Sequence, residues 1–167
     1  MTIFVLLFAI QAASGTASQL AFTTKELAEY RLSLPVFKKF EQASRLIATA
    51  TRDDEKLADN PLFTREVSVL GDAPVVAAEL EARLKGEPAL AAALRASNIS
   101  PHEYAKFALS LFAARLAHGF VKSGALRVIP AGVATDNVGF VETHDAAVAA
   151  VLQTLGVEGP LGSRNEP

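Results

Sequence analysis

The 167-residue sequence predicts an all-α protein: a single compact bundle of five to seven helices around a long central helix at about residues 101–122. Apolar residues recur at steps of three or four along nearly every segment, which is the period of an amphipathic helix. Proline, glycine, serine and threonine stand where helices are expected to begin and end. No internal repeat or long linker divides the chain, so we expect one domain over residues 18–157.

The composition narrows the class of protein. Half of the residues are hydrophobic, a fifth are charged and the formal net charge is -2, which suits an ordinary globular domain. A nucleic-acid partner is not expected, because the sequence has no excess of basic residues to neutralise phosphates. Cysteine is absent, which excludes disulfides, thiolate metal sites and a cysteine nucleophile. The stability of the fold must therefore come from its core.

The N-terminal segment has the pattern of an export signal. The apolar run IFVLLFAI is followed by the small and polar run QAASGTASQ, and the first charged residue is Lys25. We expect residues 1–17 to be a signal peptide that is cut after Ala17. The apolar run is shorter than the roughly 20 residues that span a bilayer, so no membrane span is expected after cleavage. A buried N-terminal strand or helix is the alternative, because the two residues before the run lack the usual positive charge.

Two helices are predicted in the first third of the chain. Thr23 and Thr24 with Glu26 can start a short helix that runs to Tyr30. Pro35 suits the first turn of the next helix, because its missing N–H has no intrahelical partner there. Apolar residues then follow one face until the charge-rich connector TRDDEKLADNP: Val36, Phe40, Ala43, Ile47 and Ala50.

A helical hairpin is predicted next. The segment NPLFTREVSVLGDAP is ambiguous, because its valines and leucine fit a short strand as well as a helical turn. Asp72 can cap a helix that has Pro74 in its first turn, and Gly86 is placed to end it. The run EPALAAALRASN repeats the pattern, with Pro88 near its start.

The run SPHE marks the start of the central helix. Ser100 as N-cap, Pro101 at the first position and Glu103 at the third form a capping box, in which each side chain satisfies a free backbone N–H. The helix can continue to about Lys122, where a Ser-Gly pair ends it. At about 1.5 Å per residue it would be roughly 33 Å long, enough to cross the domain.

The remaining sequence predicts a connection and a helical end. ALRVIPAGVA has the composition of an irregular or extended connection. Thr135 is expected to cap the segment DNVGFVETH. Residues 158–167 have little to bury and are expected to form a disordered tail. A last helix closes at Gly156, with apolar residues on one face: Val148, Val151, Leu152 and Leu155.

Two runs, NISPHEYAKFALSLFAARLA and IPAGVATDNVGFVETH, resemble a group of small exported bacterial proteins with no established activity. In that group a Ser-Pro-type cap opens a long alanine-rich helix, and a Pro/Gly connection leads to an Asn-Val-x-Phe-Val-x-x-His segment. The resemblance covers mainly residues 98–144 and, more loosely, the helix after Pro35. It implies a helical fold and a periplasmic or secreted location, and it implies no chemistry.

Signatures of catalysis and cofactor binding are missing from the sequence. It has no Gly-rich phosphate loop, no serine nucleophile flanked by glycines and no Ser-x-x-Lys. HEYAK lacks the second histidine of a zinc-protease motif, so His102 and Glu103 are best interpreted as the first turn of a capped helix. No cofactor is expected. A site that joins His118 to His144 with a nearby carboxylate stays open, because only the fold could assemble it.

The candidate binding residues lie along one stripe of the central helix. At 100° per residue, Phe107, Leu111, Arg115, His118 and Lys122 lie within about 60° of Tyr104. The stripe is apolar near the start of the helix and cationic near its end. If Arg115 is buried it needs a carboxylate, which the segment that folds back can supply from Asp136, Glu142 or Asp145.

Two interpretations of this stripe follow. In the first, Arg115 belongs to a structural ion pair or an exposed helix end. In the second, a pocket binds an anionic or amphipathic ligand through Tyr104, Arg115, His118, Lys122, Glu142 and His144. The absence of catalytic signatures favours a non-enzymatic exported protein that binds an unidentified small ligand or an envelope protein. The alternatives are a metal-binding protein and a hydrolase with its site near His118 and His144.

Overall fold

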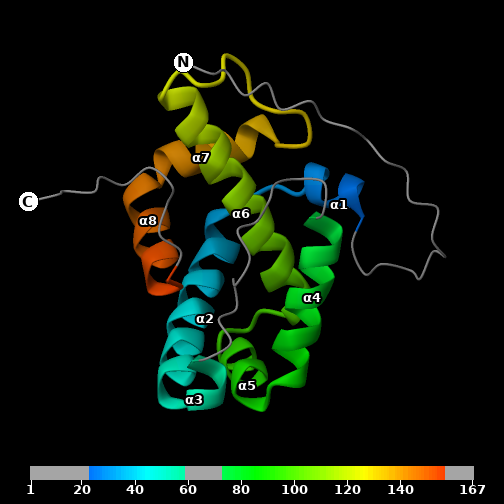
Figure 1. The fold of residues 1–167 in the computed structure, drawn as a ribbon, viewed down its shortest axis with the longest axis vertical. Coiled ribbons are helices and arrows are strands. Elements are labelled where there is room, and N and C mark those ends of the chain that lie inside the picture. Colours follow the sequence, from blue (N-terminus) through cyan, green and yellow to red (C-terminus); the bar gives the residue numbers. More distant parts are fainter. Residues whose placement is uncertain (1–22, 59–72, 157–167) are drawn as a thin grey trace, which may run out of the picture.

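The computed structural model describes residues 23–58 and 73–156, which form an all-α fold (Figure 1). α3 (Glu55–Ala58) is a single turn. Within the described residues, seven further helices surround a common core: α1 (Thr24–Glu29), α2 (Leu34–Asp53), α4 (Ala73–Gly86), α5 (Pro88–Ala96), α6 (Pro101–Lys122), α7 (Thr135–Thr143) and α8 (Asp145–Thr154). The prediction of a compact helical bundle around residues 101–122 is confirmed.

Several predictions concern residues outside the described ranges. These are the signal peptide over residues 1–17, the ambiguous segment with its Asp72 cap, and the tail over residues 158–167. They stay predictions.

α6 is the axis of the bundle (Figure 1). It contacts α1, α2, α4, α5 and α7. A helix that is apolar on most of its faces must be covered on several sides, and this explains the apolar breadth of the α6 sequence. The buried side chains end at Ala117, so the last turn of α6 is not covered by the described helices: Tyr104, Ala105, Phe107, Ala108, Leu109, Ser110, Leu111, Phe112, Ala114 and Ala117 are buried.

An aromatic cluster joins α1 and α2 to the first half of α6. The centroid of the Phe107 ring lies 4.9 Å from that of Phe40, 6.2 Å from that of Phe37 and 6.3 Å from that of Tyr30. The Tyr104 ring lies 4.7 Å from Phe40. Burying one large apolar side chain contributes about 1.5–3 kcal/mol, so this cluster is a main source of stability for the N-terminal end of α6.

Most helix boundaries follow the signals in the sequence. The Thr23 hydroxyl accepts a hydrogen bond from the Glu26 N–H at 3.0 Å and caps α1. Pro35 and Pro88 lie in the first turns of α2 and α5, and α4 ends at Gly86. These boundaries are set by local backbone chemistry, which is why the sequence predicts them well.

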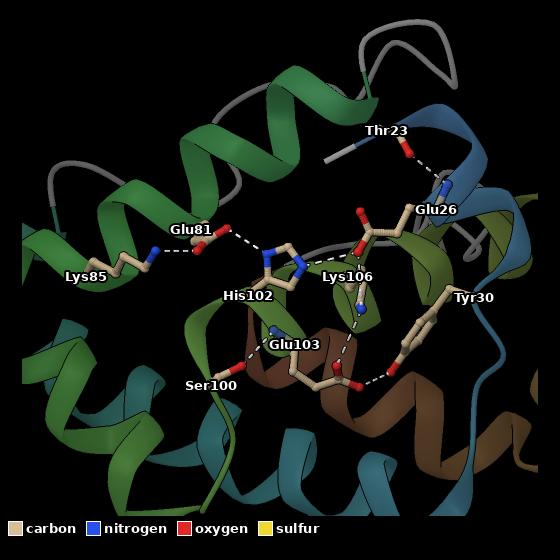
Figure 2. A network of polar contacts seen from close by, with 9 residues as sticks. All are labelled: Thr23, Glu26, Tyr30, Glu81, Lys85, Ser100, His102, Glu103 and Lys106. Atoms are coloured by element: carbon tan, nitrogen blue, oxygen red, sulfur yellow. Dashed lines mark hydrogen bonds and ion pairs between the residues drawn. The ribbon is translucent and has the colours of Figure 1, made fainter. Parts of the chain in front are cut away.

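Two boundary details differ from the prediction. Thr135 is the first residue of α7 and not its cap, because the extended Ala134 supplies the carbonyl that accepts the first helical hydrogen bonds. At α6 the Ser100 hydroxyl accepts from the Glu103 N–H at 3.0 Å, as expected of a capping box. The carboxylate of Glu103, however, extends to the hydroxyl of Tyr30 (Figure 2).

The connection between α6 and α7 is irregular, as predicted, but it is anchored. Gly124 ends α6 with a φ of 75°, a conformation that favours glycine. Ile129 and Val133 pack against the core from within the connection. α7 and α8 are separate helices that meet at His144.

Candidate functional site

The structure places the predicted binding residues in different environments. Tyr104 is fully buried, and its hydroxyl lies 3.0 Å from that of Ser44 on α2. Burial raises the pKa of Tyr104 well above the ordinary value for a phenol. Tyr104 is therefore a neutral core residue at the packed end of α6.

Arg115 forms an ion pair with Asp145, the first residue of α8. Asp145 is one of the three carboxylates that the sequence offers for this role. The Arg115 side chain is 34% exposed and the Asp145 side chain is 44% exposed. Exposed pairs contribute roughly 0–1 kcal/mol, so this contact links α6 to α8 without a large effect on stability.

His144 is held by aromatic contacts. Its ring centroid lies 4.6 Å from that of Phe140 and 6.5 Å from that of Phe37. His144 is also the residue at which α7 ends. These contacts account for its position at the junction of α7 and α8.

The other predicted residues lie toward the surface. Glu142 and Lys122 are exposed, and His118 is partly buried. The His118 Nδ1 atom is buried and has no hydrogen-bond partner in the described part of the chain. Among residues 23–58 and 73–156, no three His, Cys, Asp or Glu side chains are arranged to hold a metal ion.

A polar network that the sequence does not reveal lies at the N-terminal end of α6 (Figure 2). His102 stands between two other helices: its Nδ1 lies 3.0 Å from Oε2 of Glu81 on α4, and its Nε2 lies 3.2 Å from Oε1 of Glu26 on α1. An ionised carboxylate only accepts hydrogen bonds, and a neutral imidazole has one N–H. Both contacts are therefore hydrogen bonds only when His102 carries a second proton.

Two glutamates of this network, Glu26 and Glu81, have pKa values that favour the ionised form. Burial alone would raise the pKa of Glu81, but hydrogen bonds from Lys85 and His102 outweigh it and lower the pKa below the usual value. Burial would also raise the pKa of Glu26, but His102 and Lys106 outweigh this effect and lower it. The Glu81 side chain is only 7% exposed, so these partners are what make its charge tolerable there.

Lys106 connects the two sides of the network. Its Nζ lies 3.3 Å from Oε1 of Glu26 and 3.7 Å from Oε2 of Glu103, and 5.2 Å from the centre of the Tyr30 ring. The Tyr30 hydroxyl donates a hydrogen bond to Glu103, and burial together with this carboxylate raises the pKa of Tyr30. The network thus fastens α1 to the start of α6.

The opposite end of α6 is apolar, cationic and exposed. Phe120 is 38% exposed, Val121 39%, Leu126 36% and Val128 74%. Lys122 and Arg127 are exposed in the same stretch of sequence. Neither has an ion-pair partner among the residues that the structure describes. We name this surface the α6 tip; it consists of Phe120, Val121, Lys122, Leu126, Arg127 and Val128.

The backbone of the α6 tip is held in place. The Leu126 N–H donates to the Phe120 carbonyl at 3.1 Å, and the Gly124 N–H donates to the Val121 carbonyl at 3.0 Å. Ile129, the next residue after Val128, packs against the core. The exposed side chains are therefore presented by an anchored segment, at one extreme of the long axis of the molecule (Figure 1).

Two hollows lie elsewhere on the described part of the chain. An apolar pocket of about 90 Å³ lies between α1, α6 and the segment before α7, and Ser110 is among its lining residues. Pockets for small ligands are commonly about 300–1,000 Å³, so this one fits only a few atoms. A second hollow, of about 390 Å³, has all of its described lining residues on α2: Lys38, Glu41, Gln42, Arg45 and Leu46. The described residues therefore supply one side of this hollow and no opposing wall.

Comparison of the chain with protein-family models, with curated protein sequences and with solved structures finds no match. The resemblance to exported bacterial proteins therefore stays a prediction.

The structure does give the Asn-Val-x-Phe motif of that resemblance a structural role. The buried Asn137 amide donates to the Tyr30 carbonyl at 2.9 Å, and its oxygen accepts from the Leu32 N–H at 2.9 Å. No described helix is both long enough and apolar enough to cross a membrane.

Proposed function

We propose that this protein is an exported helical interaction module, without catalytic activity, that docks onto a component of the cell envelope through the α6 tip. The observation that carries the proposal is the exposure of four apolar side chains within nine residues of an anchored segment. Single exposed apolar residues are ordinary on protein surfaces. Grouped ones mark interaction sites.

The environments of the predicted site residues favour docking over catalysis. Arg115 is paired with Asp145, His144 lies against phenylalanine rings, and Tyr104 is part of the core. A catalytic group needs a reactive atom that faces a substrate at hydrogen-bond distance. Lys122 is the member of the predicted set that lies on the α6 tip, and it keeps the role of a binding residue in this proposal.

The sequence supports the export part of the proposal. Residues 1–17 combine an apolar run with a small-residue cleavage region. The resemblance over residues 98–144 points to the bacterial envelope. An envelope location brings the protein close to both membrane surfaces and envelope proteins, so a docking surface has candidate partners there.

The proposal can be tested with a photo-crosslinking amino acid in cells that export the full chain. The probe replaces Val128 in one variant and Val75 in a control; Val75 is another exposed valine, on α4. We expect adducts, whether with lipid or with protein, to form several-fold more often at position 128. Equal labelling at the two positions would show that the tip is not a docking surface. Fractionation of the same cells measures export directly.

A further inference from the structure

We propose that the surface to which the α6 tip docks is an anionic lipid bilayer. This inference rests on the proposed function, because it names the partner of the same surface. Three features favour a bilayer: the charge distribution around the tip, its exposed apolar side chains and its position on the molecule.

The charge distribution favours an anionic partner. No aspartate or glutamate occurs between Glu103 and Asp136, although the whole chain has a net charge of -2. Lys122 and Arg127 are therefore a local concentration of positive charge on a slightly acidic protein. Basic residues beside apolar ones are attracted to anionic headgroups, and the attraction is lost within about one Debye length, near 10 Å at 0.1 M salt.

The other cations of α6 are already paired. Lys106 contacts two glutamates, and Arg115 contacts Asp145. The cations of the tip differ, because no carboxylate in the described ranges reaches them. They stay available to phosphate groups, and the stem of Lys122 can lie along apolar surface while its ammonium group reaches the headgroups.

The apolar side chains suit the interfacial region of a bilayer. Val128 is the most exposed of the large apolar residues that the structure describes, at 74%. Its neighbour Ile129 packs against the core, which fixes Val128 on the outward side of the chain. Phe120 adds an exposed aromatic ring to the last turn of α6. Apolar and aromatic residues next to Lys and Arg are the usual composition of segments that bind at the headgroup boundary.

The position of the tip favours a bilayer over a protein groove. The tip lies at one extreme of the long axis (Figure 1), where it projects beyond the helices that cover the rest of α6. A projecting surface needs a matching hollow in a protein partner. A fluid headgroup layer closes around such a surface without one.

Vesicle co-sedimentation tests the assignment. The protein is used in the form in which cells export it. The probes are vesicles of phosphatidylglycerol mixed with phosphatidylcholine, and vesicles of phosphatidylcholine alone. We expect binding to the anionic vesicles to exceed binding to the neutral ones and to fall as salt is added. Lys122→Gln and Arg127→Gln should each weaken anionic binding about fivefold, and the double variant about 25-fold. Val128→Asp should weaken it about tenfold or more.

Two control variants match these changes in charge elsewhere on the bundle. Lys39→Gln removes an exposed lysine from α2, and Val75→Asp adds a carboxylate at an exposed valine of α4. Neither should alter vesicle binding. Equal effects of tip and control variants would overturn the lipid assignment, as would equal binding to anionic and neutral vesicles.

The outcomes separate this inference from the proposed function. Protein adducts at position 128 without a preference for anionic vesicles would remove the lipid assignment and leave the docking surface in place. Loss of the crosslinking preference at position 128 would remove both. The unfolding midpoint of each tip variant should equal that of the parent chain. Weaker binding then reflects the changed surface and not a loss of the fold.

Discussion

The two ends of α6 differ in whether their cationic side chains contact carboxylates. At the N-terminal end, His102 and Lys106 contact glutamates from α1, α4 and α6 (Figure 2). At the C-terminal end, Lys122 and Arg127 have no carboxylate partner in the described part of the chain. Cations at the first end fasten helices to one another, and cations at the second end face outward among apolar side chains.

The difference follows from what each end is packed against. α1 and α4 flank the start of α6 and carry Glu26 and Glu81 there. Around the last turn of α6 the sequence supplies no carboxylate between Glu103 and Asp136. Lys122 is nevertheless compatible with a stable helix, because a cation in the last turn interacts with the helix dipole by about 0.3–1 kcal/mol. A helix end can therefore keep its cations free for a partner at little expense to the fold.

The largest expected effect compares two phenylalanines of the same helix. Phe107→Ala should destabilise the protein by about 3–5 kcal/mol, because it removes a buried ring that contacts α1 and α2. Phe120→Ala removes a ring that is 38% exposed and should change the unfolding free energy by less than about 1 kcal/mol. Urea denaturation measures both. Similar losses would mean that the tip is as much a part of the core as the aromatic cluster.

The next effect tests the buried carboxylate of the network. Glu81→Gln keeps the size of the side chain but weakens its contacts with Lys85 and His102, and we expect a loss of about 1.5 kcal/mol. Glu41→Gln is the matched control, because Glu41 pairs with Arg45 at the same i,i+4 spacing on the outer face of α2. That change should stay below about 0.5 kcal/mol. Equal losses of unfolding free energy would show that burial does not strengthen the contacts of Glu81.

Local signals in the sequence predict most of the fold. Prolines at helix starts, Thr23 and Ser100 as caps, and Gly86 and the Ser-Gly pair as ends all act within one turn of chain. The helical wheel predicts the site less well. Tyr104 and Lys122 share a stripe, but they lie about 27 Å apart along the helix. One is therefore buried in the bundle while the other lies beyond it.

The sequence does not predict the network at His102, for a related reason. It predicts that His102 and Glu103 form the first turn of a capped helix, which is correct for the backbone. The partners of the imidazole come from positions 21 and 76 residues away in sequence, and only the packing of α1 and α4 brings them there. Two i,i+4 spacings in the sequence bear on the network. Glu81 and Lys85 have opposite charges, whereas His102 and Lys106 are both basic, which favours carboxylate partners from other helices.

A smaller effect concerns pH. The lowered pKa values of Glu26 and Glu81 mean that their contribution to stability is present above the ordinary carboxyl range and is lost as the pH falls through the folded values. His102 is one of the partners that lower the pKa values of both carboxyl groups. We expect the parent chain to exceed His102→Gln in stability by about 1 kcal/mol near pH 7 and by less near pH 3, where the glutamates take up protons.

Chemical denaturation at the two pH values measures this difference. His144→Gln serves as the control, because His144 contacts aromatic rings and its replacement should not follow the same trend. A stability difference for His102→Gln that stays constant from about pH 7 to about pH 3 would contradict the role of the ionised glutamates.

The same substitution should have a very small effect on stability at the C-terminal end of α6 and a larger one at its N-terminal end. Lys122→Gln should change the unfolding free energy by at most about 0.5 kcal/mol, because the side chain is exposed. Lys106→Gln should reduce it by about 1–2 kcal/mol, because the Lys106 side chain is only 17% exposed and contacts two carboxylates. Vesicle binding should show the reverse order, with a loss for Lys122→Gln and none for Lys106→Gln in the folded protein. A Lys122→Gln variant as unstable as Lys106→Gln would mean that Lys122 has a partner within the fold, and the reason for assigning it to docking would be gone.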